Sequence, residues 1–236
     1  MTTLNKNHIS WYNENYYNKN NPRFNSWSLK LLKLISSKDL GNKKILDLGC
    51  GEAKILASLH KNKKIKASNL YGIDQSNKAI EIASASIPNG NLVAGDIYNL
   101  KYKNEFLDYI FLLETIEHLE NPEQVLKEIH KVIKKAGKLY ISFPNYFNFP
   151  WLLVRIFAQL FNKPNWIVLQ PIDKIYNFYQ VIKMVEKIGF RKVASFGTCY
   201  FPPILYKFEN LKISSIFDKL GLSLLAFHPI IVFEKK

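Results

Sequence analysis

The sequence predicts an α/β fold with a seven-stranded, mostly parallel sheet, helices on both of its faces and an antiparallel last strand. From Lys44 onward, short apolar runs such as KILDLG and NLYGID alternate with helical patterns such as SNKAIEIASAS. This alternation is typical of parallel strands joined by crossover helices. The chain has 236 residues, of which 47% are hydrophobic and only 10 are Gly and 10 Pro, and this composition suits one globular domain.

Three parts make up that single predicted domain, 1–236. In residues 1–43, a polar and aromatic stretch is followed by Ser28 and the helical run LKLLKLI, which predicts an N-terminal helical cap. Residues 44–145 contain the alternating strands and helices of the predicted cofactor-binding half. Residues 146–236 begin with an aromatic insertion, and we expect them to form the half that faces the substrate.

The segment NPEQVLKEIHKVIKKAGKLYISFPN carries the clearest local pattern. Asn121 can cap a helix, Pro122 suits its first turn, and the apolar positions from Val125 to Ile133 share one face. We expect this helix to end near Gly137 and the strand LYISF to follow. Further on, VIKMVEKIGFRKVASFG repeats helix, glycine and strand, and HPIIVFEKK reads as the last strand.

Composition bounds the environment of the protein. Cys50 and Cys199 are too few for a disulfide framework or a zinc site, and the first residues lack the apolar core of a signal peptide. We therefore expect a cytoplasmic protein, with peripheral membrane contact as an option. The net charge of +14 fits an anionic partner such as phosphorylated substrate, lipid headgroups or, less favoured, nucleic acid. It also fits a coding bias, because lysine is accompanied by abundant Asn and Ile. The sequence leaves the oligomeric state open.

The stretch ILDLGCGEAKIL predicts a ligand site where a strand becomes a helix. Gly49 and Gly51 allow a tight turn and a close backbone approach, and the following helix start offers free amides. Asp47 in an apolar strand needs a partner, because an unpaired buried carboxylate is costly. A dinucleotide site would need a third glycine where Lys54 stands, so an NAD-dependent oxidoreductase is the weaker alternative.

DLGCGEA resembles the first motif of class I S-adenosylmethionine-dependent methyltransferases, with Ala53 at the usual third glycine. The resemblance covers roughly Lys44 to Asn145 and implies a Rossmann-like sheet with S-adenosylmethionine as cofactor. It implies that Asp74 meets the ribose hydroxyls and that Asp96, beside the apolar Ile97, meets the adenine amino group. The full set of cofactor-binding residues so implied is Asp47, Gly49, Cys50, Gly51, Asp74, Gln75, Asp96, Ile97 and Glu114. Asp74 could alternatively cap the next helix.

The run LLETIEHLENP resembles the E-x-x-E-H segment of the subgroup (type 11) that contains ubiquinone-biosynthesis O-methyltransferases. His118 is then the candidate catalytic base, since imidazole titrates near neutrality, or else it orders the loop by bonding to backbone. A minority alternative is a metal site of Glu114, Glu117 and His118, similar to that of small-RNA 2′-O-methyltransferases, with Asp173 nearest to the further ligand required. Asn145 and Tyr16 are the predicted substrate contacts.

These patterns together predict methyl transfer to a small-molecule or lipid- or glycan-linked acceptor, most readily at oxygen. A catalytically silent module that only binds the cofactor is the alternative. The insertion YFNFPWLLVRIFAQLFNKPNWIVLQ predicts a short helix that is apolar nearly all round, with Arg155, Gln159 and Lys163 as polar interruptions. It is either core packing against the C-terminal segment or a lid for an apolar acceptor that also touches a membrane surface.

Overall fold

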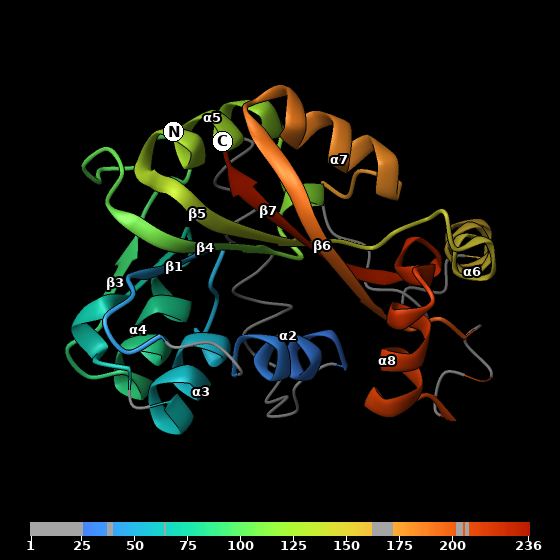
Figure 1. Ribbon diagram of the computed structural model, residues 1–236, viewed down its shortest axis with the longest axis horizontal. Helices are drawn as coiled ribbons and strands as arrows, with labels where there is room; N and C mark the ends of the chain where they lie inside the picture. The colour runs from blue at the N-terminus through green and yellow to red at the C-terminus, as the bar shows by residue number, and fades with distance from the viewer. Residues whose placement is uncertain (1–25, 37–39, 64, 162–171, 202–204, 206–207) are drawn as a thin grey trace.

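The computed structural model describes residues 26–36, 40–63, 65–161, 172–201, 205 and 208–236. They form a seven-stranded sheet in the order β3-β2-β1-β4-β5-β7-β6 (Figure 1). Only β7 runs antiparallel to its neighbours, β5 and β6, so the predicted sheet is confirmed. The strands are β1 (Ile45–Leu48), β2 (Leu70–Asp74), β3 (Asn91–Ala94), β4 (Leu107–Leu113), β5 (Ile133–Ser142), β6 (Phe190–Thr198) and β7 (His228–Lys235).

Helices cover both faces of the sheet (Figure 1). On one face, α5 and α7 pack on the side chains of Leu46, Ile110 and Ile141. On the other face, α2, α3 and α4 pack on a second cluster that includes Ile45 and Phe111. Alternate strand residues enter opposite clusters, as expected for strands buried on both sides. The helices are α2 (Ser26–Ser36), α3 (Lys54–Lys63), α4 (Asn77–Ser86), α5 (Pro122–Val132), α6 (Phe149–Leu160), α7 (Phe178–Lys187) and α8 (Leu211–Lys219).

Helix α5 ends earlier than the sequence indicates. It stops at Val132, not near Gly137, and β5 starts at the next residue. Ile133 keeps the helical amide bond to Ile129 but already has extended backbone angles and pairs with Leu107 of β4. Pairing with β4 thus overrides a helical pattern that continues in the sequence. The start of α5 is as predicted, since the Asn121 side chain accepts a bond from the Gln124 amide.

The N-terminal helix α2 is held to the body by a buried ion pair. Lys30 is 2% exposed, and its ammonium group lies 2.5 Å from the Asp218 carboxylate of α8. This helix confirms the helical part of the predicted cap, whereas residues 1–25, including Tyr16, lie outside the described residues. None of the helices in the described ranges is long and apolar enough to cross a membrane.

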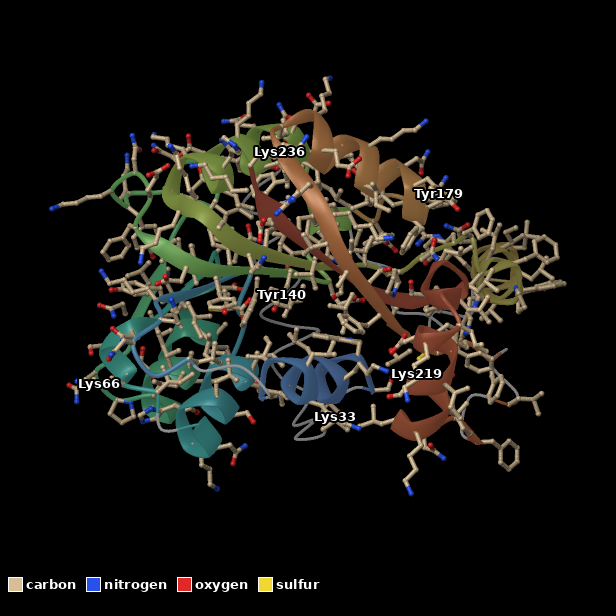
Figure 2. The ribbon with its side chains drawn as sticks, in the orientation of Figure 1. Lys33, Lys66, Tyr140, Tyr179, Lys219 and Lys236 are labelled. Carbon is tan, nitrogen blue, oxygen red and sulfur yellow. The ribbon has the colours of Figure 1, made fainter. Side chains whose placement is uncertain are left out.

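The labelled lysines in Figure 2, Lys33, Lys66, Lys219 and Lys236, lie on different parts of the surface, whereas Tyr140 lies inside against the sheet. These four lysines therefore do not share one face of the protein.

Candidate cofactor and acceptor site

The glycine loop follows β1 and is bound tightly to the end of β2. The amides of Gly49 and Cys50 both donate to the Ile73 carbonyl, at 2.8 and 3.1 Å. Gly49 has a φ of 72° and Gly51 a φ of 51°, in the left-handed region that glycine enters without a steric penalty. A Cβ atom on Gly49 would lie 2.7 Å from Oγ1 of Thr115. This loop therefore requires glycine at position 49 for two separate reasons.

Ala53 occupies the position of the usual third glycine of the motif. It is fully buried, has a φ of 52°, and its carbonyl accepts the Ala57 amide at 2.8 Å in the first turn of α3. The turn is thus formed without glycine, at a backbone cost of roughly 1–2 kcal/mol for a side chain in the left-handed region.

Asp74 links the end of β2 to the glycine loop. Its Oδ2 accepts the Gly51 amide at 2.8 Å, and its Oδ1 accepts the Ser76 amide at 2.9 Å. The cap of α4 is Ser76, whose hydroxyl accepts the Ala79 amide, so the capping alternative for Asp74 is wrong. A carboxylate has lone pairs for further donors, so both bonds are compatible with the predicted contact to ribose.

Asp47 is a buried carboxyl group without a hydrogen-bond donor among the described residues. It is 4% exposed in the middle of β1, and within the described part of the chain no group donates a hydrogen bond to its side chain. Burial, and secondly the neighbouring Asp74 carboxylate, raise the pKa of Asp47 to about 8. A ligand that brings positive charge or hydrogen-bond donors would satisfy this group, and the amino and sulfonium groups of S-adenosylmethionine fit that requirement.

The remaining predicted cofactor residues lie along the same edge of the sheet. Asp96 is exposed after β3, and its Oδ1 accepts the Tyr98 amide at 2.8 Å. Ile97 is half-buried against the core, and Gln75 is exposed at the end of β2. The Cys50 thiol is a free cysteine whose pKa is raised by burial and then by Asp47 and Asp74, so it is not a nucleophile at neutral pH.

Glu114 follows β4 and is fixed from two sides. It has a φ of 48°, and its Oε1 accepts the Ser142 hydroxyl at 2.7 Å. Its Oε2 lies 2.9 Å from Nδ1 of His228, without hydrogen-bond geometry. Sequence reasoning missed Ser142 and His228, because they are brought to Glu114 by the neighbouring strands β5 and β7 and no local motif marks them.

His118 and Glu117 form a buried pair in the turn after β4. His118 Nδ1 lies 2.6 Å from the Ile172 carbonyl, so this nitrogen carries the hydrogen and donates it, and Nε2 of the neutral ring is unprotonated. Burial lowers the pKa of His118, which favours the neutral ring. Glu117 is 1% exposed and lies 3.6 Å from His118 Nε2 through its Oε1. Burial, followed by the Glu114 carboxylate, raises the pKa of Glu117 well above its usual range.

The minority metal alternative finds no support in this geometry. Glu114 points toward Ser142 and His228, whereas Glu117 and His118 form their own pair. Asp173, the nearest counterpart of a further ligand, is bound to Arg155 at 2.8 Å. In the described residues, no group of three or more His, Cys, Asp or Glu side chains is arranged to hold a metal ion.

Asn145 is fully buried behind the acceptor side. Its side-chain amide donates to the carbonyls of Leu224 and Ala226, and its Oδ1 accepts the amides of Phe147 and Phe178. These bonds use the donors of the amide group, so Asn145 shapes the wall after β5 through backbone contacts. Its predicted contact with substrate remains a prediction, as does that of Tyr16, which lies outside the described residues.

The predicted short helix after β5 is present as α6, and it borders a pocket of about 240 Å³. Trp151 stacks on Phe227 at 4.6 Å between ring centroids, and the side-chain Nδ2 of Asn148 donates to the Leu225 carbonyl. The beginning of α6 therefore packs on the C-terminal segment, as one alternative predicted. The pocket is lined by Tyr146, Phe147, Leu152, Ile175, Tyr176, Asn177 and Gln180.

Replacing Gly49 by alanine tests the fit of the loop. Gly221 is a matched control, because its φ of 73° equals that of Gly49 within a degree but no atom lies within 4 Å of its Cβ position. Gly221→Ala should cost about 1 kcal/mol from backbone strain alone. Gly49→Ala should cost roughly 1–3 kcal/mol more, because it also overpacks against Thr115. Urea denaturation measures both, and equal losses would show that Thr115 gives way freely.

Asp47→Asn tests the buried acid through the pH dependence of stability. The folded-state pKa of about 8 lies above the unfolded value of 3.8, so between these limits the unfolded state binds fewer protons and wild-type stability falls as pH rises. The variant lacks this penalty. At pH 8 the free energy of unfolding of the ligand-free variant should exceed that of wild type by on the order of a few kcal/mol, while at pH 4 the two values should be similar. A difference that does not grow with pH would contradict the assignment.

The chain is similar to known methyltransferases from β1 to β5. A family model described as a methyltransferase domain matches residues 46–141, from β1 to β5. Demethylmenaquinone methyltransferase of Thermotoga maritima is 28% identical over 115 residues, which are 49% of this chain and 48% of that protein. The mitochondrial ubiquinone biosynthesis O-methyltransferase of Dictyostelium discoideum is 30% identical over 113 residues, which are 42% of this chain and 34% of that protein. The chain thus spans half or less of these relatives.

Solved structures share the fold over a greater length. The crystal structure of an S-adenosylmethionine-dependent methyltransferase from Thermotoga maritima matches with a TM-score of 0.63 and covers 89% of each chain at 21% identity. At this identity the likeness concerns the fold alone. Residues 46–141 thus match a methyltransferase domain, and the sheet around them has the fold of S-adenosylmethionine-dependent methyltransferases.

Proposed function

We propose that this protein transfers the methyl group of S-adenosylmethionine to an oxygen atom of an apolar small-molecule or lipid-linked acceptor. The observation that carries the proposal is the neutral His118 ring, whose Nδ1 hydrogen is bound by the Ile172 carbonyl. The names of two relatives refer to demethylmenaquinone and ubiquinone, and the second names an O-methyltransferase, which supports an apolar quinone-type acceptor. The three parts of the chain then act as one domain.

The cofactor would be held by the loop and the strand-end acids. Asp74 accepts the Gly51 amide beside the turn, Asp47 adds a buried carboxyl group with a raised pKa, and Asp96 lies beyond the neighbouring strand. When bound, S-adenosylmethionine supplies a methyl group already activated by the sulfonium charge. The task of the protein is therefore chiefly to align the acceptor and exclude water.

His118 would accept the acceptor's hydroxyl proton at Nε2. Its Nδ1–H bond to Ile172 fixes the ring orientation and leaves Nε2 as the basic nitrogen. Glu117 beside it is held neutral by burial, so it does not stabilise a protonated ring before the reaction, and Nε2 is ready as a base. Proton transfer to a positioned imidazole contributes roughly a hundredfold or more to rate.

Two substitutions at His118 separate a base from a loop-ordering role. His118→Ala removes both functions, whereas His118→Asn can keep a donor to the Ile172 carbonyl but has no basic nitrogen. We expect both variants to lower turnover by roughly a hundredfold or more with little change in cofactor affinity. The assay follows transfer of a deuterated methyl group to hydroxylated quinone-type acceptors by mass spectrometry, with calorimetry for the cofactor, and we expect wild-type activity to persist in EDTA.

His60→Ala is the matched control for this test. His60 also bonds a backbone carbonyl through Nδ1, that of Ile65 at 2.7 Å, but it lies on α3 away from the acceptor side. It should keep full turnover. Wild-type-like activity in His118→Asn would assign His118 to loop ordering, and loss of activity in EDTA restored by magnesium or manganese would favour a metal site.

We further propose that α6 contacts an anionic membrane surface, so that the protein is cytoplasmic and peripheral to a bilayer. The exposed side chains on the outer face of α6 are apolar apart from one glutamine. Leu160, its last residue, and Phe161, which follows it, are 73% and 61% exposed. Aromatic and aliphatic side chains on such a helix bind at the headgroup boundary, and a net charge of +14 favours anionic lipids. The remaining exposed apolar residues of α6 are Phe149, Leu153, Ile156 and Phe157.

Vesicle co-sedimentation tests this contact. The wild type should bind vesicles containing phosphatidylglycerol weakly, bind pure phosphatidylcholine vesicles less, and be released by high salt. Phe157→Glu with Leu160→Glu should remove binding. Trp151 is unsuitable for this test because it stacks on Phe227. The control, Ile216→Glu with Leu220→Glu, makes the same charge change on α8 at residues that are 57% and 65% exposed, and should bind nearly as wild type. Equal loss in both pairs would indicate a general charge effect.

A further inference from the structure

The only charged residue of α6, Arg155, is turned into the protein. Its side chain is 5% exposed, and its Nη1 donates to the Tyr146 hydroxyl and to Asp173 Oδ2, both at 2.8 Å. Its Nη2 donates to the Asp173 main-chain carbonyl at 2.9 Å. The guanidinium group also lies over the Tyr146 ring, 4.9 Å from its centroid. Arg155 therefore hydrogen-bonds to both the side chain and the backbone of Asp173.

The segment that Arg155 holds also holds the turn after β4. On one side of Asp173, the Ile172 carbonyl receives the Nδ1 hydrogen of His118 at 2.6 Å. On the other side, the Lys174 amide donates to the Glu117 carbonyl at 2.9 Å. Residues 172–174 thus connect α6 to both members of the buried pair: Asp173 is bound by Arg155, and its two neighbours hydrogen-bond to His118 and Glu117.

We propose that Arg155 is a positioning residue for His118: by fixing the segment 172–174 from α6, it keeps the His118 ring in the tautomer with hydrogen on Nδ1. The inference rests on the proposed function only in calling His118 the base. Without the bonds from Arg155 to Asp173, the Ile172 carbonyl can move away from the His118 ring. The hydrogen can then sit on Nε2 and leave no basic nitrogen toward the acceptor.

The chemistry of Arg155 suits positioning better than stabilisation. Burying an ion pair costs desolvation that an apolar side chain would avoid, so a buried pair adds little to stability by itself. A guanidinium group, however, offers several donors in a rigid plane and can hold a carboxylate and a carbonyl of one residue together. The charged and titratable groups that face His118 are Glu114, Glu117, Asp173 and Arg155.

A charge-balanced double variant tests the proposal. Arg155→Met with Asp173→Asn removes these bonds and leaves no single buried charge behind. With ¹⁵N-labelled histidine, two-bond proton–nitrogen NMR spectra distinguish the tautomers, and the His118→Ala spectrum identifies the signals of His118. We expect one Nδ1–H tautomer in wild type, a mixture in the variant, and turnover lowered roughly tenfold or more, with KM for the acceptor and cofactor affinity changed much less. Lys187→Met with Glu123→Gln, which removes an exposed ion pair in the same charge-balanced way, should behave as wild type.

Arg155→Lys provides a second reading should the double variant fail to fold. Lysine keeps the positive charge beside Asp173 but not the planar set of donors, so it should populate the Nε2–H tautomer less than the double variant does and lose correspondingly less turnover. An unchanged Nδ1–H tautomer in a folded variant would overturn the proposal. If wild type transfers no methyl group at all, the proposed function fails, yet the tautomer measured by NMR still decides whether Arg155 positions His118.

Discussion

The amides of Gly49 and Cys50 share one acceptor, the Ile73 carbonyl, and this shared bond fixes where the chain leaves β1. Thr115 then closes the loop from the side of β4, with its hydroxyl bonded to the carbonyls of Leu48 and Leu113. A side chain at position 49 would enter the space that Thr115 fills. The ends of three adjacent strands are thus brought together at one backbone turn, and the cofactor residues and the acceptor-side turn both depend on this contact.

Buried acids give this edge of the sheet its electrostatic character. Asp47 is kept from ionising by burial and by Asp74, and Glu117 by burial and by Glu114. Such groups are unfavourable in an empty protein and become favourable when a ligand supplies charge or donors. The two acids lie in different parts of the site, one after β1 beside the glycine loop and one in the turn after β4. Each side of the proposed site therefore contains its own buried carboxyl group that a ligand could pair with, Asp47 for the cofactor and Glu117 for the acceptor.

Helix α6 is arranged opposite to an ordinary surface helix. Its charged residue is buried and bonded to Asp173, whereas apolar side chains such as Leu160 face outward. In Figure 1 the helix stands apart from the layers that cover the sheet. Its beginning is tied to the C-terminal segment through Asn148 and Trp151, so the two alternatives for the insertion, core packing and an exposed apolar surface, describe different parts of one helix.

Much of the fold was determined by local sequence. Alternating apolar runs predicted the sheet, Asn121 and Pro122 marked the start of α5, and Gly49 and Gly51 marked the tight turn after β1. These features depend on residues close together in the chain, where period, capping and turn chemistry act directly. The end of α5 was predicted wrongly, because pairing of Ile133 with β4 is a contact between distant segments.

Only the tertiary structure decided the surroundings of the acceptor side. The bonds of Glu114 to Ser142 and of His118 to Ile172 join residues 28 and 54 positions apart. The inward turn of Arg155 likewise depends on Asp173, beyond the end of its own helix. Sequence identified His118 as a basic side chain but not which nitrogen carries the hydrogen. That property follows from which carbonyl the folded chain places against the ring, and no local pattern specifies it.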